Sequence, residues 1–242
     1  MGSYREQGIV LRTWKLGETD RILNLLTQGR GKVRAVAKGV RRPGSRFGGR
    51  LEPYSHVDLQ LHEGRNLDVV RQAELIRSYA EVREDYSLST CGALMVEAVD
   101  VVAQEGERDN RVFLLLRAGL EALAARPPYP AIFADAFLLR LASAVGFHVF
   151  TDACSSCRSA GPHPFLSVVA GGMLCADCAP PGTKALDPDT IALVQLLAGN
   201  EWQRLPSAAT QVGPRSTAAS FTRAFVEYHL DRRLRSYELV PR

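Results

Sequence analysis

Two pairs of cysteines constrain this chain more than any other feature of its sequence. Cys154 is followed after two residues by Cys157, Cys175 after two residues by Cys178, and 17 residues separate the pairs. Two residues between cysteines allow a tight turn that points both thiolates at one tetrahedral ion, and two such turns supply four ligands. Since four thiolates leave no position open for water or substrate, the pattern predicts one structural Zn²⁺ ion in a zinc ribbon or knuckle.

Two alternatives to this zinc site stay open. The four thiols could form a metal-free dithiol switch, and His163, which lies between the pairs, could replace one cysteine as a ligand. A zinc deaminase is not supported, because its cysteine pair follows a proline and an upstream His-x-Glu motif, whereas Ala153 and Leu174 precede the pairs here. The fifth cysteine, Cys91, lies among apolar residues, which favours a buried thiol without chemistry.

The first part of the chain has the pattern of β-strands. Five short apolar or alternating runs are separated by glycine-rich turns, and they span residues 8–14, 21–26, 32–40, 57–62 and 67–73. Five strands within about 70 residues, with no long amphipathic helix to cover an open sheet, predict a small barrel of the OB-fold type. An open sandwich of three plus two strands is the alternative, and the run 21–26 could also be a turn of helix.

From residue 79 onward the apolar spacing changes to that of helices. A dense apolar run at 94–102 indicates a buried helix, and Asp109 has the position of an N-cap for a helix ending near residue 125. Further helices are expected over three stretches, with a loop at 200–215 before the last of them: 131–145, 190–197 behind a cap at Asp187, and 216–234. One apolar stripe of the last helix is expected to face the core: Phe221, Phe225 and Tyr228.

These patterns together predict a multidomain chain. An all-β OB-fold domain is expected at 1–79 and an α-helical domain at 80–150. A four-cysteine zinc-binding insertion follows at 151–182, and C-terminal helices at 183–242 complete the helical domain.

Positive charge is concentrated in the barrel region. The whole chain has a net charge of +4, but residues 1–80 hold 15 Lys and Arg against 8 Asp and Glu, a net of +7, and residues 81–242 hold 15 against 18, a net of −3. A basic stretch without one acidic residue predicts a DNA-binding surface made of Lys32, Arg34, Lys38, Arg41, Arg42, Arg46 and Arg50. A charged face that only aids solubility is the alternative.

Alternation within this stretch supports such a surface. In a strand over 32–38, the side chains of Lys32, Arg34 and Lys38 share one face, opposite small apolar residues. The loop 41–50 suits contacts to the phosphate backbone more than the reading of bases. Phe47 is the one aromatic residue of this loop that could stack on a base. Trp14 and Tyr54 could line the same groove, although aromatic residues of small barrels are more often part of the core.

Other classes of protein find no support in the sequence. No run approaches the roughly 18 apolar residues of a membrane helix, and residues 1–6 show no signal peptide, so a cytoplasmic protein is expected. The glycine-rich motifs of NTPases and dinucleotide enzymes are absent, as are His-Glu-x-x-His and Gly-x-Ser-x-Gly. The five histidines show no pairing at ligand or triad spacing.

Several motifs closely resemble those of the bacterial RecO recombination-mediator proteins. They begin with the runs GIVLRT at 8–13, GETDRIL at 17–23, GKVRAVAKGVRR at 31–42 and LEP at 51–53. The same order of parts continues with LLRL at 138–141, Gly146 and Phe147, the two cysteine pairs, and LRS at 234–236. The resemblance covers nearly the whole chain.

This resemblance implies a protein that binds DNA without catalytic turnover. Members of the family have an OB-fold, a helical domain and, where the cysteines occur, a zinc-binding insertion. They bind single- and double-stranded DNA, anneal complementary strands, and act with RecR to load RecA onto strands covered by single-strand-binding protein (SSB). The implied location is the nucleoid in the cytoplasm. Two alternative functions stay open: a metal-dependent nuclease of DNA repair, and a protein-interaction adaptor without DNA binding.

Overall fold

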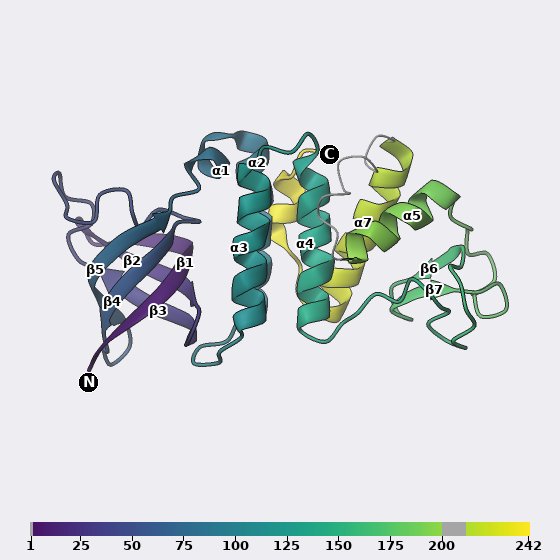
Figure 1. Ribbon diagram of the computed structural model, residues 1–242, viewed down its shortest axis with the longest axis horizontal. Coiled ribbons are helices and arrows are strands. Elements are labelled where there is room, and N and C mark those ends of the chain that lie inside the picture. Colours follow the sequence, from purple (N-terminus) through teal and green to yellow (C-terminus); the bar gives the residue numbers. More distant parts are fainter. Residues whose placement is uncertain (1, 200–211) are drawn as a thin grey trace. The chain divides into compact units, whose positions relative to one another are not determined.

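The computed structural model describes residues 2–199 and 212–242, which gather into two compact units, 1–124 and 125–242 (Figure 1). Among the described residues, no helix combines the length and the apolar character that crossing a membrane requires. The predicted loop at 200–215 lies outside the described residues, except for 212–215.

The first unit begins with a closed five-stranded barrel. The strands are β1 (Ser3–Leu16), β2 (Asp20–Thr27), β3 (Gly31–Ala37), β4 (His56–His62) and β5 (Asp68–Arg77), in the order β1-β2-β3-β5-β4. All neighbours are antiparallel except β3 and β5, which are parallel. The predicted OB-like barrel is confirmed, and both the open sandwich and the helical turn at 21–26 are wrong. The strand predicted over 32–40 ends earlier, at Ala37.

Alternation along these strands builds the barrel core. The buried side chains pack as one cluster, to which the loop after β3 adds three residues: Val10, Leu23, Leu25, Ala35, Ala37, Val57, Leu59, Leu61 and Val70 from the strands, and Val40, Phe47 and Leu51 from the loop. Burial of these apolar groups stabilises the barrel by about 25 cal/mol for each Å² removed from water. This loop, residues 38–55, is called the basic loop below. It is attached to the barrel by its own apolar side chains.

A β-bulge interrupts β1 between Val10 and Arg12. The N–H of Val10 donates to the carbonyl of Ser55 (3.0 Å), and the carbonyl of Val10 accepts from the N–H of Tyr54 (2.8 Å). Leu11 is the extra residue, because Val10 pairs with Leu25 and Arg12 already pairs with Asn24. One extra residue reverses the faces to which later side chains of the strand point.

Three helices complete the first unit: α1 (Ala80–Glu84), α2 (Tyr86–Val102) and α3 (Asn110–Ala124). The Asp109 side chain accepts from the N–H groups of Arg111 (2.9 Å) and Val112 (3.3 Å), which confirms the predicted N-cap of α3. The loop between α2 and α3 lies against the start of β3. A Cβ at Gly31, whose φ is +65°, would lie 2.1 Å from the carbonyl oxygen of Glu107, so only glycine fits.

The second unit contains α4 (Pro130–Ala144), α5 (Pro188–Ala198), α7 (Val212–His229) and the short 3-10 helix η2 (Arg235–Leu239). Between α4 and α5 lies a cysteine-rich segment with the hairpin β6 (Phe165–Ser167) and β7 (Gly172–Leu174). Asp187 accepts from the N–H of Thr190 (2.8 Å) and confirms the predicted cap of α5.

The last helix differs from its prediction at both ends. It begins at Val212, so residues 212–215 are helical, and Pro214 is tolerated because the first turn needs no N–H donor there. It ends at His229 instead of residue 234, since Asp231 adopts a left-handed conformation (φ +49°). Phe221 and Phe225 are buried as predicted, but Tyr228 is exposed, so the prediction of a buried stripe is wrong at that residue.

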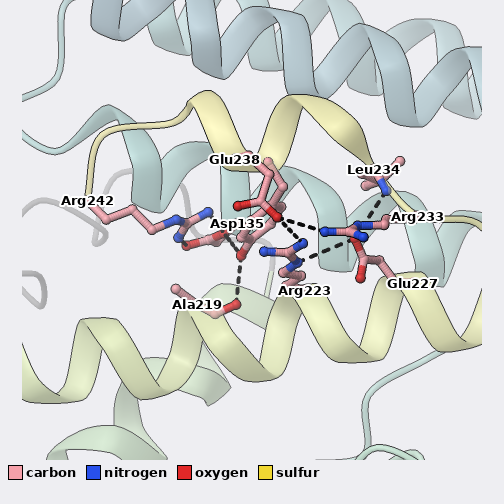
Figure 2. A network of polar contacts seen from close by, with 9 residues as sticks. Asp135, Ala219, Arg223, Glu227, Arg233, Leu234, Glu238 and Arg242 are labelled. Carbon is pink, nitrogen blue, oxygen red and sulfur yellow. Dashed lines mark hydrogen bonds and ion pairs between the residues drawn. The ribbon is translucent and has the colours of Figure 1, made fainter.

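A buried ion network joins α4, α7 and the C-terminal segment of this unit (Figure 2). Asp135 of α4, only 2% exposed, receives two hydrogen bonds from Arg242 (2.7 and 3.0 Å) and one from the Tyr237 hydroxyl (3.0 Å). The same hydroxyl also contacts the carbonyl oxygen of Ala219 (2.7 Å). Burial raises the pKa of Asp135, and Arg242 opposes that rise. The carboxylate is thus held by an arginine 107 residues away in sequence.

Candidate metal centre and nucleic-acid interface

The four paired cysteines come together in the second unit. Their Sγ atoms all lie within 4.8 Å of one another, and those of Cys157 and Cys175 are 3.7 Å apart. Four sulfurs placed about 2.3 Å from a central zinc ion would be about 3.8 Å apart, so the cluster has the dimensions of a tetrahedral thiolate site. The four cysteines could therefore hold a metal ion.

Short turns create this geometry, as the spacing predicts. The carbonyl of Cys154 accepts from the N–H of Arg158 (2.9 Å), and that of Cys175 accepts from the N–H of Cys178 (3.2 Å). The two turns approach each other because the N–H of Cys175 donates to the sulfur of Cys154 (3.4 Å). A Cβ at Gly172 would lie 2.2 Å from the carbonyl oxygen of Phe150, so glycine is required where the hairpin passes Phe150.

The pKa shifts of Cys154, Cys157 and Cys178 also favour a bound cation. Burial raises the pKa of Cys154, but backbone N–H groups in the two turns outweigh it and lower that pKa to about 6. Ser159 lowers the pKa of Cys157. Ser156 lowers the pKa of Cys178, yet neighbouring thiols raise it more, so that thiol keeps its proton to higher pH. Thiolates packed this closely repel one another, and a divalent cation between them would remove that repulsion.

His163 does not join this cluster. Its Nε2 atom lies 3.0 Å from the carbonyl oxygen of Ser159 and 3.2 Å from the Ser159 hydroxyl. Within residues 2–199 and 212–242, the four cysteines are the only group of three or more His, Cys, Asp or Glu residues close enough to share a metal ion. The geometry thus favours four cysteines over the alternative with His163. Cys91 is fully buried in α2, as predicted.

The predicted DNA-binding residues lie in the first unit, on β3 and on the loop that follows it. Six of the seven are exposed: Arg34, Lys38, Arg41, Arg42, Arg46 and Arg50. None of these six forms an ion pair with a carboxylate in the described part of the chain. Their positive charge is therefore available to an anionic partner.

Lys32, the seventh, lies in a different environment. Its ammonium donates to the backbone carbonyl of Asp100 (2.8 Å) and to the carboxylate of the same residue (3.1 Å). Asn24 donates to that carboxylate as well (2.7 Å). The Lys32 side chain is only 19% exposed, so its charge is engaged in joining β3 to α2.

Hydrogen bonds fix the first part of the basic loop to the turn between β1 and β2. The guanidinium of Arg41 donates to the carbonyl of Glu18 (2.9 Å), and the N–H of Arg41 donates to the carbonyl of Thr19 (2.9 Å). The Asp20 carboxylate accepts from the N–H of Gly39 (2.8 Å), and this bond lowers its pKa. The loop is thus positioned beside the β1–β2 turn.

The expectation that Phe47 could stack on a base is wrong. Its side chain is 1% exposed and belongs to the barrel core, with the guanidinium of Arg46 over its ring at 4.9 Å. Tyr54 is buried, as expected for a barrel aromatic, but Trp14 is 43% exposed on β1. Arg12 lies 6.0 Å from the centre of its indole ring. The local signal that could have found Trp14 is its position between two cations, Arg12 and Lys15.

Comparisons with known proteins cover the whole chain. The family model "Recombination protein O N terminal" matches residues 1–79, and the model "Recombination protein O C terminal" matches residues 83–238. A protein of Nocardioides sp. named DNA repair protein RecO is 44% identical over 245 residues, which span 99% of each chain. A protein of the same name from Thermobifida fusca is 42% identical over 244 residues and the full length of both chains. With a barrel, helices and a cysteine cluster in the expected order, this chain belongs to the RecO family of DNA repair proteins.

Proposed function

We propose that this chain is a non-enzymatic mediator of DNA repair and recombination. It binds single- and double-stranded DNA, anneals complementary strands and, with RecR, helps load RecA onto strands covered by SSB. The observation that carries the proposal is the set of six exposed cations between Arg34 and Arg50 without carboxylate partners among the described residues. Phosphate groups supply the missing negative charge.

The proposed DNA surface consists of cations of β3 and of the loop that follows it. Arg34, Lys38, Arg41, Arg42, Arg46 and Arg50 contact phosphates, and we expect the contribution of Lys32 to be the smallest because Asp100 already holds its ammonium. Attachment of the loop to the barrel core through Phe47 presents these cations on a fixed base. Contacts of this kind bind many sequences with similar affinity, as strand annealing requires.

We propose Zn²⁺ as the ion of the cysteine cluster. Four thiolates with no free position form a closed site, which stabilises the segment 151–182 and leaves no place for a substrate. The mediator therefore acts by holding strands and partners, in the cytoplasm at the nucleoid. Support for RecR, SSB and RecA as partners comes from membership of the family.

A charge reversal tests the DNA surface. The variant Lys38→Glu, Arg41→Glu, Arg42→Glu should bind both single- and double-stranded DNA about 10- to 1,000-fold more weakly, and the slope of log affinity against log salt should fall by about 2–3. Fluorescence anisotropy of labelled oligonucleotides between about 50 and 200 mM salt measures both quantities.

The matched control changes the same number of charges elsewhere. Arg108, Lys184 and Arg232 are exposed cations outside the basic loop, and their combined replacement by Glu should leave most of the affinity intact. Equal losses of DNA affinity in the two triple variants would show that only the net charge of the protein matters. An unchanged affinity of the loop variant would refute the proposed surface. Cleavage of DNA by repurified protein in Mg²⁺ would support the nuclease alternative instead.

A further inference from the structure

We propose that Trp14 stacks on an unpaired base, so that the exposed part of the outer barrel face around Trp14 is a binding site for single-stranded nucleic acid. This inference rests on the proposed DNA-binding function and extends it to a different element. The basic loop supplies charge for any nucleic acid, whereas an exposed indole supplies a contact that only an unpaired base can make.

The β-bulge in β1 decides where Trp14 points. Before the bulge, Val10 pairs with Leu25 and faces the core. After it, Thr13 pairs with the core residue Leu23, so Trp14 falls on the outer face. Without the extra residue, strict alternation would place Trp14 on the same face as Val10. The bulge thus turns a side chain that would be core into a surface group.

The neighbours of Trp14 on this face form an apolar row. Trp14 pairs with Ile22, and Ile22 pairs with Val36 on the next strand. Leu16, two residues beyond Trp14 on the same face, is also exposed. The indole is therefore supported from the side while 43% of its surface stays open. A flat, partly supported aromatic group of this kind suits a base plane.

Cations flank this apolar row. Arg12 pairs with Asn24, and Asn24 pairs with Arg34. Both arginines therefore lie in the row of paired residues next to the row of Trp14. Lys38 directly follows the end of β3, beyond the row of Trp14. Within the described residues, neither arginine forms an ion pair. A phosphate on either side of a stacked base would find a guanidinium within reach.

The carboxylates at this end of the barrel do not cancel that charge, and one of them, Glu52, is already paired with Arg21 (2.8 Å). Asp20 is engaged by the N–H of Gly39 (2.8 Å) and the Thr19 hydroxyl (2.8 Å). Glu18 is exposed in the β1–β2 turn, where its carbonyl receives Arg41. The other cations around Asp20 and Glu18, including Arg12, Lys15 and Lys38, are more numerous than these two carboxylates. This charge balance favours a nucleic acid over an acidic or neutral protein as the occupant.

The experiment uses the full-length protein with Trp202→Phe, which leaves Trp14 as its single indole because the chain has two tryptophans. Titration with oligothymidylate of about 15 nucleotides should quench the fluorescence of Trp14. A duplex, and an abasic strand of the same length and charge, should bind without that quenching. Trp14→Ala should weaken binding to oligothymidylate about 5- to 100-fold and leave the affinities for the duplex and the abasic strand nearly unchanged.

Two further variants separate stacking from loss of structure. Trp14→Phe should recover most of the affinity for oligothymidylate, because a ring remains. Tyr86→Ala removes a 71% exposed aromatic residue of α2 in the same unit and should leave all three affinities unchanged. Binding of oligothymidylate without any change in Trp14 fluorescence, or an equal effect of Trp14→Ala on all three ligands, would overturn the inference.

Failure of this inference is distinguishable from failure of the proposed function. If Trp14→Ala has no effect while the charge reversal at Lys38, Arg41 and Arg42 still weakens binding, the DNA surface stands and the stacking site does not. If the wild-type protein binds none of the three ligands, the proposed function itself fails.

Discussion

Two arginine-rich stretches of this chain differ in whether their arginines form ion pairs. Between residues 34 and 50, the arginines are exposed and have no ion pair with a described carboxylate. Between residues 223 and 242, Arg223 pairs with Glu227 and Glu238, Arg233 pairs with Glu238, and Arg242 pairs with Asp135. A run of arginines in the sequence therefore does not by itself indicate a phosphate-binding surface.

The difference lies in where the carboxylates are. In the C-terminal stretch they occur in the same segment, or reach it from α4, so the arginines stabilise the fold (Figure 2). In the basic loop the nearest carboxylates are held by other groups, as Asp20 is by the N–H of Gly39. Substitutions in the second unit should accordingly change stability, and substitutions in the basic loop should change DNA affinity.

Removal of the cysteine cluster should have the largest effect on the second unit. Cys154→Ser with Cys157→Ser should reduce the metal content from one ion per chain to none and make segment 151–182 sensitive to proteases, because we propose that metal ligation holds this segment together. Elemental analysis and limited proteolysis measure these changes. DNA affinity should stay nearly unchanged, and Cys91→Ala should keep its metal. A metal-free wild-type protein that resists proteolysis would contradict the proposed site.

Loss of Arg242 should be the next largest effect. Arg242→Ala leaves the buried carboxylate of Asp135 without its cation and should lower the free energy of unfolding by about 3–5 kcal/mol. Urea denaturation measures the loss. The exposed Arg232→Ala should change stability by less than about 0.5 kcal/mol. Equal effects of the two variants would remove the distinction between paired and exposed arginines.

The stability loss in Arg242→Ala should depend on pH. Burial raises the folded-state pKa of Asp135 above its ordinary value, and removal of Arg242 takes away the charge that opposes this rise. In the variant, Asp135 then binds a proton more readily in the folded state than in the unfolded state. The stability of the variant therefore increases as pH falls. The difference between wild type and variant should thus shrink on acidification, and a difference that grows would contradict the assignment.

Lys32 and Arg34, two residues apart on β3, offer a test with a smaller expected effect. Lys32→Met should lower the free energy of unfolding by about 1–2 kcal/mol, because Asp100 loses a charged donor, with little change in the salt dependence of DNA binding. Arg34→Met should leave stability within about 0.5 kcal/mol and reduce the salt slope by about 0.7–0.9. Exchange of these two outcomes would show that Lys32 contacts DNA and that Arg34 does not.

We expect the smallest effect from His56 of the first unit, whose substitution should change only the pH dependence of stability. Burial lowers its pKa, as does the charge of Arg117, while Glu121 and Asp58 act in the opposite direction. Because the folded state prefers the neutral imidazole, the stability present above the unfolded-state pKa of about 6.5 is lost as pH falls through the lower folded-state pKa. His56→Phe, which keeps a ring against Phe113, should flatten this acid dependence in thermal unfolding. An unaltered dependence would point to another group.

Several features follow from local patterns and were predictable. The alternation of apolar residues produced the five strands, because each strand places every second side chain in one core. Asp109 and Asp187 cap the helices behind them through contacts two or three residues away. The cysteine cluster follows from two turns of fixed length. In each case, the interacting groups are close in sequence or share a regular period.

Other features depend on groups that are distant in sequence, and the tertiary structure alone decided them. Phe47 is buried because the loop folds back into the barrel, and the charge of Lys32 is engaged because Asp100 lies beside it. Trp14 faces outward because a bulge, bonded to residues 54 and 55, shifts the alternation by one residue.

Local sequence patterns thus predict which elements form, which cysteines can share an ion and where the positive charge is concentrated. The tertiary structure decided which cations are free for a ligand and which aromatic residue accompanies them. The physical reason is that strand alternation and turn spacing act between near neighbours, whereas ion pairing and burial depend on residues brought together by the whole fold.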